Sequence, residues 1–99
     1  MVNFENSGSQ LRVTFSGRMD TKTCQELASQ VDKELSASSS GVVFDLKGVD
    51  YVCSAFLRIC LQAAKLKGAD AFSVVNVTPP VMLVLKTAGL DKIFKATSV

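Results

Sequence analysis

Hydrophobic residues recur along this 99-residue chain in two spacings, one typical of strands and one typical of helices. Leu11, Val13 and Phe15 alternate with polar residues, which predicts a strand over Leu11–Ser16 with one buried face. An earlier strand is expected over Met1–Glu5. Because turn-forming residues separate the two segments, the sequence predicts an antiparallel hairpin at the start of the chain.

The next segment has the spacing of a helix with one buried face. Its apolar side chains fall three or four positions apart and form a single stripe: Cys24, Leu27, Ala28, Val31 and Leu35. Thr23 is followed three positions later by Glu26, which predicts a capping box in which each side chain satisfies a free backbone donor at the helix start. The serine-rich stretch Ser36–Gly41 then indicates a loop.

A more apolar helix is predicted over Ser54–Lys67, where Arg58, Gln62 and Lys65 form a narrow polar stripe. At about 100° per residue, Ser54 lies within about 60° of Arg58 around the helix axis. We therefore expect this serine on the solvent-facing stripe. It has two interpretations: it caps the free backbone amides of the first turn, or it is a regulatory phosphorylation site.

Two nearly continuous apolar segments, Val42–Leu46 and Phe72–Val77, predict buried strands. The first of them does not alternate, which is typical of an interior strand that is covered on both faces. Thr78 and the proline after it predict the entry of a helix that continues over Val81–Ala88. Gly89 is expected to end this helix in a left-handed conformation.

A short helical turn is predicted over Leu90–Phe94, after which Lys95–Val99 are expected to fray. After the hairpin, strands and helices alternate, and strand–helix–strand units require parallel strands with right-handed crossovers. The predicted fold is therefore α/β, with a mixed sheet that starts with the hairpin, continues with parallel strands and carries three to four helices. We expect one domain over residues 1–99.

Composition narrows the classes of function. The chain is 47% hydrophobic and 20% charged, which argues against intrinsic disorder, and no apolar run approaches the length of a membrane span. We expect no membrane insertion and no secretory signal. The net charge of +2 is scattered, so no direct nucleic-acid binding is expected. Three cysteines without metal-binding spacing predict reduced thiols, a cytoplasmic location, no metal and no cofactor.

The chain contains no histidine, so the usual activation of a serine or cysteine nucleophile is missing, and we expect no catalytic residue and no enzyme. Cys53 is interpreted as a small buried thiol. Asp45 and Asp50 flank one loop, where capping of turns is favoured over acid–base catalysis. Asp20 has two interpretations, a turn or capping carboxylate and a contact to a partner beside Ser54.

Five segments together resemble a STAS domain, the family of anti-sigma-factor antagonists that is also found at the cytoplasmic ends of sulfate transporters. The segments are Phe15–Asp20, Val42–Asp50, Tyr51–Arg58, Val75–Pro79 and Ala88–Phe94. Their order and spacing carry the resemblance, which covers almost the whole chain. The family implies the mixed sheet described above and a serine at the start of the second long helix. A kinase phosphorylates that serine, and a phosphatase restores it.

The resemblance implies that Ser54 is the phosphorylated serine and that Asp20 is the acidic residue of the facing loop. In the family, the unphosphorylated form binds the kinase, which is also the anti-sigma factor, and so releases a sigma factor. The expected partners are therefore an anti-sigma factor with serine kinase activity and a serine phosphatase. The residues expected to contact a partner are Asp20, Thr21, Ser54, Ala55, Phe56 and Arg58. Phe56 has two interpretations, a core residue and an exposed apolar contact, and its angle from the polar stripe favours the core or its rim.

The usual family motif is Asp-Ser-Ser/Thr-Gly, whereas this chain has Cys53-Ser54-Ala55-Phe56. The change to Cys53 removes a carboxylate beside the hydroxyl, and Phe56 is expected to add bulk where a kinase approaches. These differences favour an alternative function, a constitutive structural subunit of a larger complex such as a lipid or anion transporter. In that case Ser54 is merely a helix cap. A third possibility, a small hydrolase or thiol enzyme, lacks a convincing base.

Overall fold

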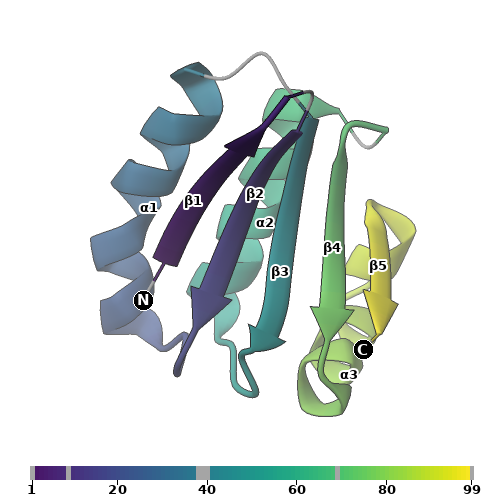
Figure 1. Ribbon diagram of the computed structural model, residues 1–99. Helices are drawn as coiled ribbons and strands as arrows, with labels where there is room; N and C mark the ends of the chain where they lie inside the picture. The colour runs from purple at the N-terminus through teal and green to yellow at the C-terminus, as the bar shows by residue number, and fades with distance from the viewer. Residues whose placement is uncertain (1, 9, 38–40, 69, 99) are drawn as a thin grey trace.

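The computed structural model describes all residues except 1, 9, 38–40, 69 and 99. Five strands form one sheet in the order β1-β2-β3-β4-β5 (Figure 1). The strands are β1 (Val2–Ser7), β2 (Gln10–Ser16), β3 (Gly41–Gly48), β4 (Phe72–Val77) and β5 (Lys95–Ser98). The helices are α1 (Thr21–Ala37), α2 (Ser54–Lys67), α3 (Pro79–Thr87) and the short 3₁₀ helix η1 (Leu90–Lys92). The first strand pair is antiparallel and the others are parallel, which confirms the predicted mixed sheet.

The three α-helices lie on one face of the sheet (Figure 1). All residues of Val42–Leu46 are buried, so the prediction of a strand covered on both faces is confirmed, although no helix covers the second face. On the face without helices, Arg12 lies opposite Val43 in the register of β2 and β3 and forms an ion pair with Asp45. A long side chain of this kind covers apolar surface with its stem while its charged end remains partly in water.

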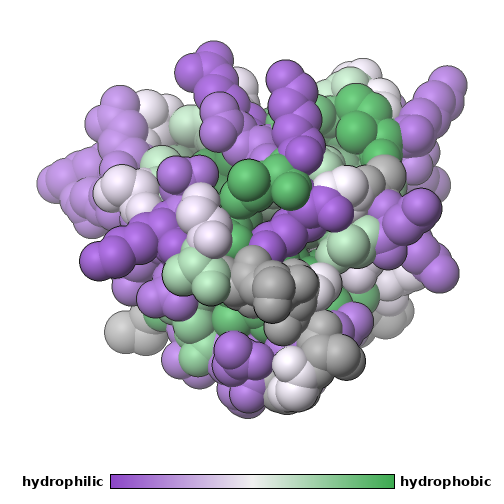
Figure 2. All heavy atoms as spheres, turned by 90° about the horizontal axis from the view of Figure 1, so that it is seen from above, coloured by the Kyte–Doolittle hydropathy of each residue, from purple (hydrophilic) through white to green (hydrophobic). Residues whose placement is uncertain are grey.

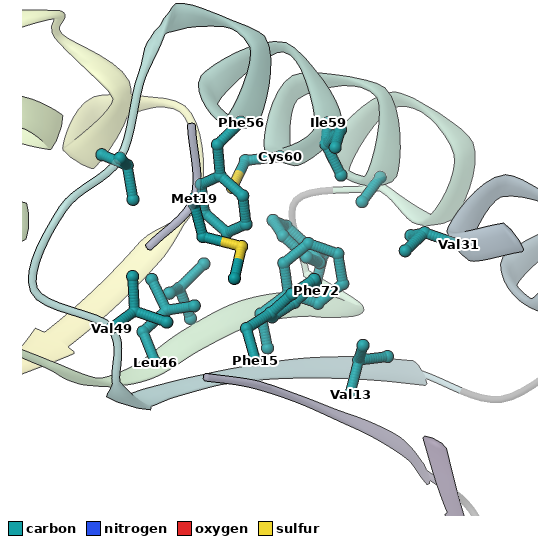
Figure 3. Packing of buried hydrophobic residues seen from close by; sticks show 14 of the residues in the cluster. Val13, Phe15, Met19, Val31, Leu46, Val49, Phe56, Ile59, Cys60 and Phe72 are labelled. Carbon is teal, nitrogen blue, oxygen red and sulfur yellow. The ribbon is translucent and has the colours of Figure 1, made fainter. Parts of the chain in front are cut away.

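The core lies between the sheet and the helices (Figure 3). It contains a continuous row of edge-to-face phenylalanine rings: Phe56, Phe15, Phe44, Phe72 and Phe94. Neighbouring ring centroids in this row are 4.8–5.1 Å apart. The row connects α2 with three strands and the chain segment that precedes β5, so it holds together parts of the chain that are far apart in sequence.

At the end of the molecule where α1 and α2 finish, seen from above in Figure 2, hydrophilic side chains dominate the surface and hydrophobic ones stand in small groups between them. The opposite end carries the loops that follow β2 and β3 and lead into α1 and α2 (Figure 1). Because parallel strands deliver their carboxyl ends to the same edge of a sheet, these two loops are neighbours.

Helix α1 begins two residues before the predicted capping box. Asp20 Oδ1 accepts a hydrogen bond from the Thr23 amide at 2.9 Å, and the Asp20 carbonyl accepts one from the Cys24 amide at 3.0 Å. Asp20 therefore caps α1, as one of its two interpretations proposed, and the capping box of Thr23 with Glu26 is wrong. Four of the five residues in the predicted apolar stripe are buried, whereas Ala28 is exposed.

Helix α3 begins at Pro79, with Thr78 in the N-cap position. The predicted entry is confirmed, but the expected hydroxyl cap is wrong, because the Thr78 hydroxyl donates to the Val49 carbonyl at 2.7 Å instead of binding the helix. This bond ties the start of α3 to the loop after β3. Gly89 has φ 76°, the left-handed conformation expected for the residue that ends the helix.

The expectation of fraying is wrong for Lys95–Ser98, because these residues form β5, and Val99 lies outside the described residues. Ser73 pairs with Lys95 and Val74 with Ala96, so β5 extends the sheet in parallel with β4. Phe94 is buried just before the strand and anchors it. The free backbone groups along the edge of β4 favour the addition of a strand even when its sequence is polar.

Asp45 is the one buried charged side chain among the described residues, with 8% exposure. Its carboxylate accepts hydrogen bonds from the Lys47 amide at 3.0 Å, from Asn76 at 3.2 Å and from Arg12. Burial raises the pKa of Asp45, but the bonds to Lys47, Arg12 and Asn76 outweigh it, and the net pKa is lowered. The bond to Lys47 closes a turn, so the carboxylate has the structural role that the sequence favoured.

We expect Asp45→Asn to lower the free energy of unfolding by about 2 kcal/mol at pH 7, because it removes a buried charge to which three donors are directed. A group whose pKa is lowered in the folded state contributes stability above its unfolded pKa, which is 3.8 for Asp45, and this contribution is lost as the pH falls through the folded pKa. The difference between wild type and variant should therefore shrink on acidification.

Urea unfolding of both proteins at pH 7 and about pH 3 measures this difference. Arg12→Met is the matched control, and its cost should be smaller because 44% of the Arg12 side chain is exposed. Equal stability of wild type and Asp45→Asn at pH 7, or a gap that widens in acid, would contradict the assignment.

Candidate functional site

Backbone hydrogen bonds hold the loop after β2 against the loop after β3. The Met19 amide donates to the Tyr51 carbonyl at 3.1 Å, and the Cys53 amide donates to the Met19 carbonyl at 3.2 Å. Met19 also forms an isolated parallel bridge with Val52. The two loops thus continue the pairing of β2 and β3 for a few residues, and they place Asp20 and Thr21 beside the start of α2.

Ser54 is the first residue of α2, and its side chain is exposed. Cys53, in extended conformation, occupies the N-cap position, so the interpretation of Ser54 as a helix cap is wrong. Among the residues that the structure describes, none forms a hydrogen bond with the Ser54 hydroxyl. The hydroxyl therefore faces solvent at a helix end where the first backbone amides have no helical acceptor and the helix dipole is positive.

Cys53 stands where the family motif has an aspartate. It is half-buried, so its interpretation as a buried thiol is only partly right, whereas Cys24 and Cys60 are buried. The Thr21 hydroxyl donates to the Cys53 sulfur at 3.8 Å. Burial raises the pKa of Cys53, but the amides of Phe56 and Ala55 and the Thr21 hydroxyl outweigh it, and the net pKa is lowered. The sulfur thus has an environment that favours the thiolate.

The other residues predicted to contact a partner differ in exposure. Thr21 and Arg58 are exposed, and Asp20 and Ala55 are half-buried. The hydrogen bond from the Thr23 amide lowers the pKa of Asp20, because it stabilises the carboxylate. These four side chains and Ser54 form the exposed surface at the start of α1 and α2, which we call the Ser54 surface.

Phe56 does not belong to the Ser54 surface. Its side chain is 0% exposed, and its ring packs edge-on against Phe15 with 5.1 Å between centroids (Figure 3). A side chain in this position cannot contact a partner. For the same reason it adds no bulk above Ser54, and the expected steric obstacle to a kinase is absent. The apolar residue at this position supports the start of α2 from the core.

The sequence analysis did not identify the stacking of Arg18 on Tyr51. The guanidinium carbon lies 3.9 Å from the ring centroid, and 40% of Tyr51 remains exposed. Such a pair is held by the attraction between the cation and the ring face. Neither residue carried a signal in the sequence, because only the pairing of the two loops brings them together. They lie in the two loops that carry Asp20 and lead into Ser54.

A groove of about 530 Å³ lies between α1 and α2. Thr21 and Ser54 line one end of it, and Ala28, Ile59 and Ala63 contribute apolar wall. Among the described residues, no group of three histidine, cysteine or acidic side chains could hold a metal ion. Within the same part of the chain, no helix has both the length and the apolar character needed to span a membrane.

A family model described as "Mlab, STAS domain" matches residues 2–95. No curated protein matches the chain. Among solved structures, an anti-sigma factor antagonist from Mycobacterium paratuberculosis has a TM-score of 0.89 at 25% identity, and the alignment covers 100% of this chain and 86% of that chain. An anti-sigma-factor antagonist (STAS) domain protein from Planctomyces limnophilus has a TM-score of 0.88 at 19% identity, with 99% and 90% covered.

The phosphorylated form of SpoIIAA, a cell fate determinant from Bacillus, is also similar, with a TM-score of 0.72 at 12% identity and 97% and 90% covered. At this identity and at that of the Planctomyces protein, the likeness shows the fold alone. The family model, by contrast, extends from the first residue of β1 to the first residue of β5. With the strand order and the helices on one face of the sheet, it establishes that the chain belongs to the STAS domain family.

Proposed function

We propose that the protein is an anti-sigma-factor antagonist that binds an anti-sigma factor through the Ser54 surface and is released when Ser54 is phosphorylated. The observation that carries the proposal is the exposed Ser54 hydroxyl, without a hydrogen-bond partner among the described residues, at the first position of α2. The likeness to a solved antagonist at 25% identity supports the class of partner.

A phosphate on Ser54 is physically compatible with the fold. The positive end of the helix dipole at the start of α2 stabilises an anion, and Arg58, one turn further on, offers an exposed cation. The phosphate adds up to two negative charges to a surface that now carries an uncharged hydroxyl. A partner that packs on the unmodified surface would have to bury these charges, so phosphorylation favours release.

The proposed contacts are Asp20, Thr21, Ser54, Ala55 and Arg58, and Phe56 acts only as support beneath them. The proposed partners are an anti-sigma factor with serine kinase activity and a serine phosphatase that reverses the modification. The protein itself is a binding module without catalytic residues, and it acts in the cytoplasm together with these partners. It binds neither nucleic acid nor membrane directly in this role.

Incubation with the cognate anti-sigma kinase and ATP is expected to add one phosphate group, and peptide mapping by mass spectrometry should place it on Ser54. The Ser54→Ala variant should gain none. Thr21→Ala, which keeps Ser54 but removes the neighbouring hydroxyl, should still be modified. Phosphate on Thr21 or no mass gain at all would contradict the proposed switch.

The second candidate function is a constitutive structural subunit of a larger complex, such as a lipid or anion transporter. The observation in its favour is Cys53, which replaces a carboxylate beside the hydroxyl in the family motif. This candidate predicts a stable complex whose affinity is the same for wild type and Ser54→Asp, together with no phosphate transfer to Ser54. The same two measurements therefore distinguish the two functions.

A further inference from the structure

Two thiols meet beneath the Ser54 surface. The Cys24 thiol, on the first turn of α1, donates to the Met19 carbonyl at 3.8 Å, and the Cys53 amide donates to the same oxygen at 3.2 Å. Each thiol also affects the pKa of the other, as expected for two sulfurs that lie close together. One backbone oxygen thus binds both residues, Cys24 through its thiol and Cys53 through its amide, where the starts of α1 and α2 lie side by side.

The two thiols have complementary properties. Cys53 is half-buried, receives the Thr21 hydroxyl at 3.8 Å and has a lowered pKa, so it is the accessible thiol with thiolate character. Cys24 is 1% exposed, and burial followed by the neighbouring Cys53 charge raises its pKa to about 12. Redox-active cysteines commonly combine an accessible thiolate with an adjacent second thiol that resolves the first product.

We propose that Cys53 and Cys24 form a redox-sensitive pair that a hydroperoxide converts to an intramolecular disulfide. The Cys53 thiolate attacks the terminal oxygen of hydrogen peroxide, the O–O bond breaks, and a sulfenic acid and hydroxide result. The Cys24 thiol then attacks the Cys53 sulfur, an S–S bond forms, and the sulfenic oxygen leaves as water. The proton of the Cys24 thiol leaves with this water, and the hydroxide from the first step takes up the proton that Cys53 released when it ionised. Overall, two thiols lose two electrons and hydrogen peroxide becomes two molecules of water.

The first step prepares the second. The negative charge of Cys53 is one cause of the raised pKa of Cys24, and this cause disappears once Cys53 is a neutral sulfenic acid. Cys60 is excluded from the first step because it is 0% exposed, and burial raises its pKa further than that of Cys24. It lies in the core beside Phe56 and Met19 (Figure 3).

The disulfide would join the first turn of α1 to the residue that precedes α2. Thr21 and Ser54 stand next to these positions, so oxidation fixes the spacing of the two helix starts on the Ser54 surface. The chemistry requires neither a kinase nor a phosphate. It therefore goes beyond the proposed function, and its test is independent of the phosphorylation test.

The experiment treats the reduced full-length protein with a few equivalents of hydrogen peroxide, blocks the remaining thiols with an alkylating agent and maps the peptides by mass spectrometry. Before alkylation, the expected product is a monomer lighter by about 2 Da than the reduced protein. After alkylation, the peptide map should show Cys24 joined to Cys53 and only Cys60 alkylated. Dithiothreitol should restore all three thiols. Before oxidation, iodoacetamide at pH 7 should modify Cys53 at least about tenfold faster than Cys24 or Cys60.

Variants separate the two steps. Cys53→Ser should abolish oxidation of Cys24. Cys24→Ser should let the sulfenic acid of Cys53 accumulate, and a cyclic 1,3-diketone should then trap this sulfenic acid. Ser29→Ala, at an exposed position of α1, is the matched control and should oxidise at the rate of the wild type. Because Cys24 is buried and its replacement by a polar side chain costs stability, the peptide map of the wild type decides. A disulfide that includes Cys60, a disulfide-linked dimer, or irreversible oxidation of Cys53 without a bond to Cys24 would overturn the proposal.

Discussion

Phe15→Ala is expected to lower the free energy of unfolding by about 4 kcal/mol, the largest effect on stability that we predict. Phe15 is fully buried, and its ring contacts the rings of Phe44 and Phe56 with centroid distances of 4.9 and 5.1 Å. The truncation removes the link between the sheet and α2 in the row of aromatic rings and leaves a cavity that rigid neighbours cannot fill. A domain of this size has a total stability of roughly 5–15 kcal/mol, so the variant should be only marginally folded.

Urea unfolding followed by circular dichroism measures this loss. Tyr51→Ala is the matched control, since it also truncates an aromatic ring but at a site that is 40% exposed, and it should cost about 1 kcal/mol or less. If the two variants lost similar stability, the aromatic row would not be the main link between α2 and the sheet.

Ser54→Asp is expected to weaken binding to the cognate anti-sigma factor by about 100-fold, which corresponds to about 2.7 kcal/mol. The carboxylate places a negative charge where the proposed complex buries an uncharged hydroxyl, and an unpaired charge in an interface is costly. The substitution should leave the fold intact, because Ser54 is exposed and an aspartate in the first turn of a helix is favourable.

Isothermal titration calorimetry with purified partner measures the affinity, and urea unfolding checks the fold. Ser54→Ala should bind like the wild type. Ser36→Asp, which adds the same charge to an exposed position at the far end of α1, should also bind normally. Unchanged affinity of Ser54→Asp would instead favour the constitutive structural subunit.

The sequence predicted best the elements whose hydrophobic pattern is strong. The bounds expected for α2 and β4 are those observed, because a long apolar helix with a narrow polar stripe and a short apolar strand between turn residues leave little ambiguity. The exposure of Ser54 follows from the same periodicity. Helix starts were less well predicted, because several residues near a boundary can cap it, and at α1 Asp20 rather than Thr23 does so.

Part of the candidate site was also readable from the sequence. The family resemblance pointed to Ser54 and Asp20, and the structure places the loops that carry them side by side. The side chain of Phe56, by contrast, was expected at the partner surface and lies in the core. A position in the first turn of a helix specifies an angle around the axis, but whether that angle meets the core depends on how the helix is docked.

Local patterns of the amino-acid sequence alone therefore determined the order of strands and helices up to η1, the hairpin, the parallel crossovers and the serine on the polar stripe of α2. The tertiary structure alone decided that the helices cover one face of the sheet, that the polar segment Lys95–Ser98 becomes β5, and that Cys24 meets Cys53 at one carbonyl oxygen. The physical reason is the distance along the chain over which each kind of interaction acts. Periodicity and turn chemistry act between near neighbours in the chain, whereas edge pairing and thiol contacts arise between segments that are brought together only by folding.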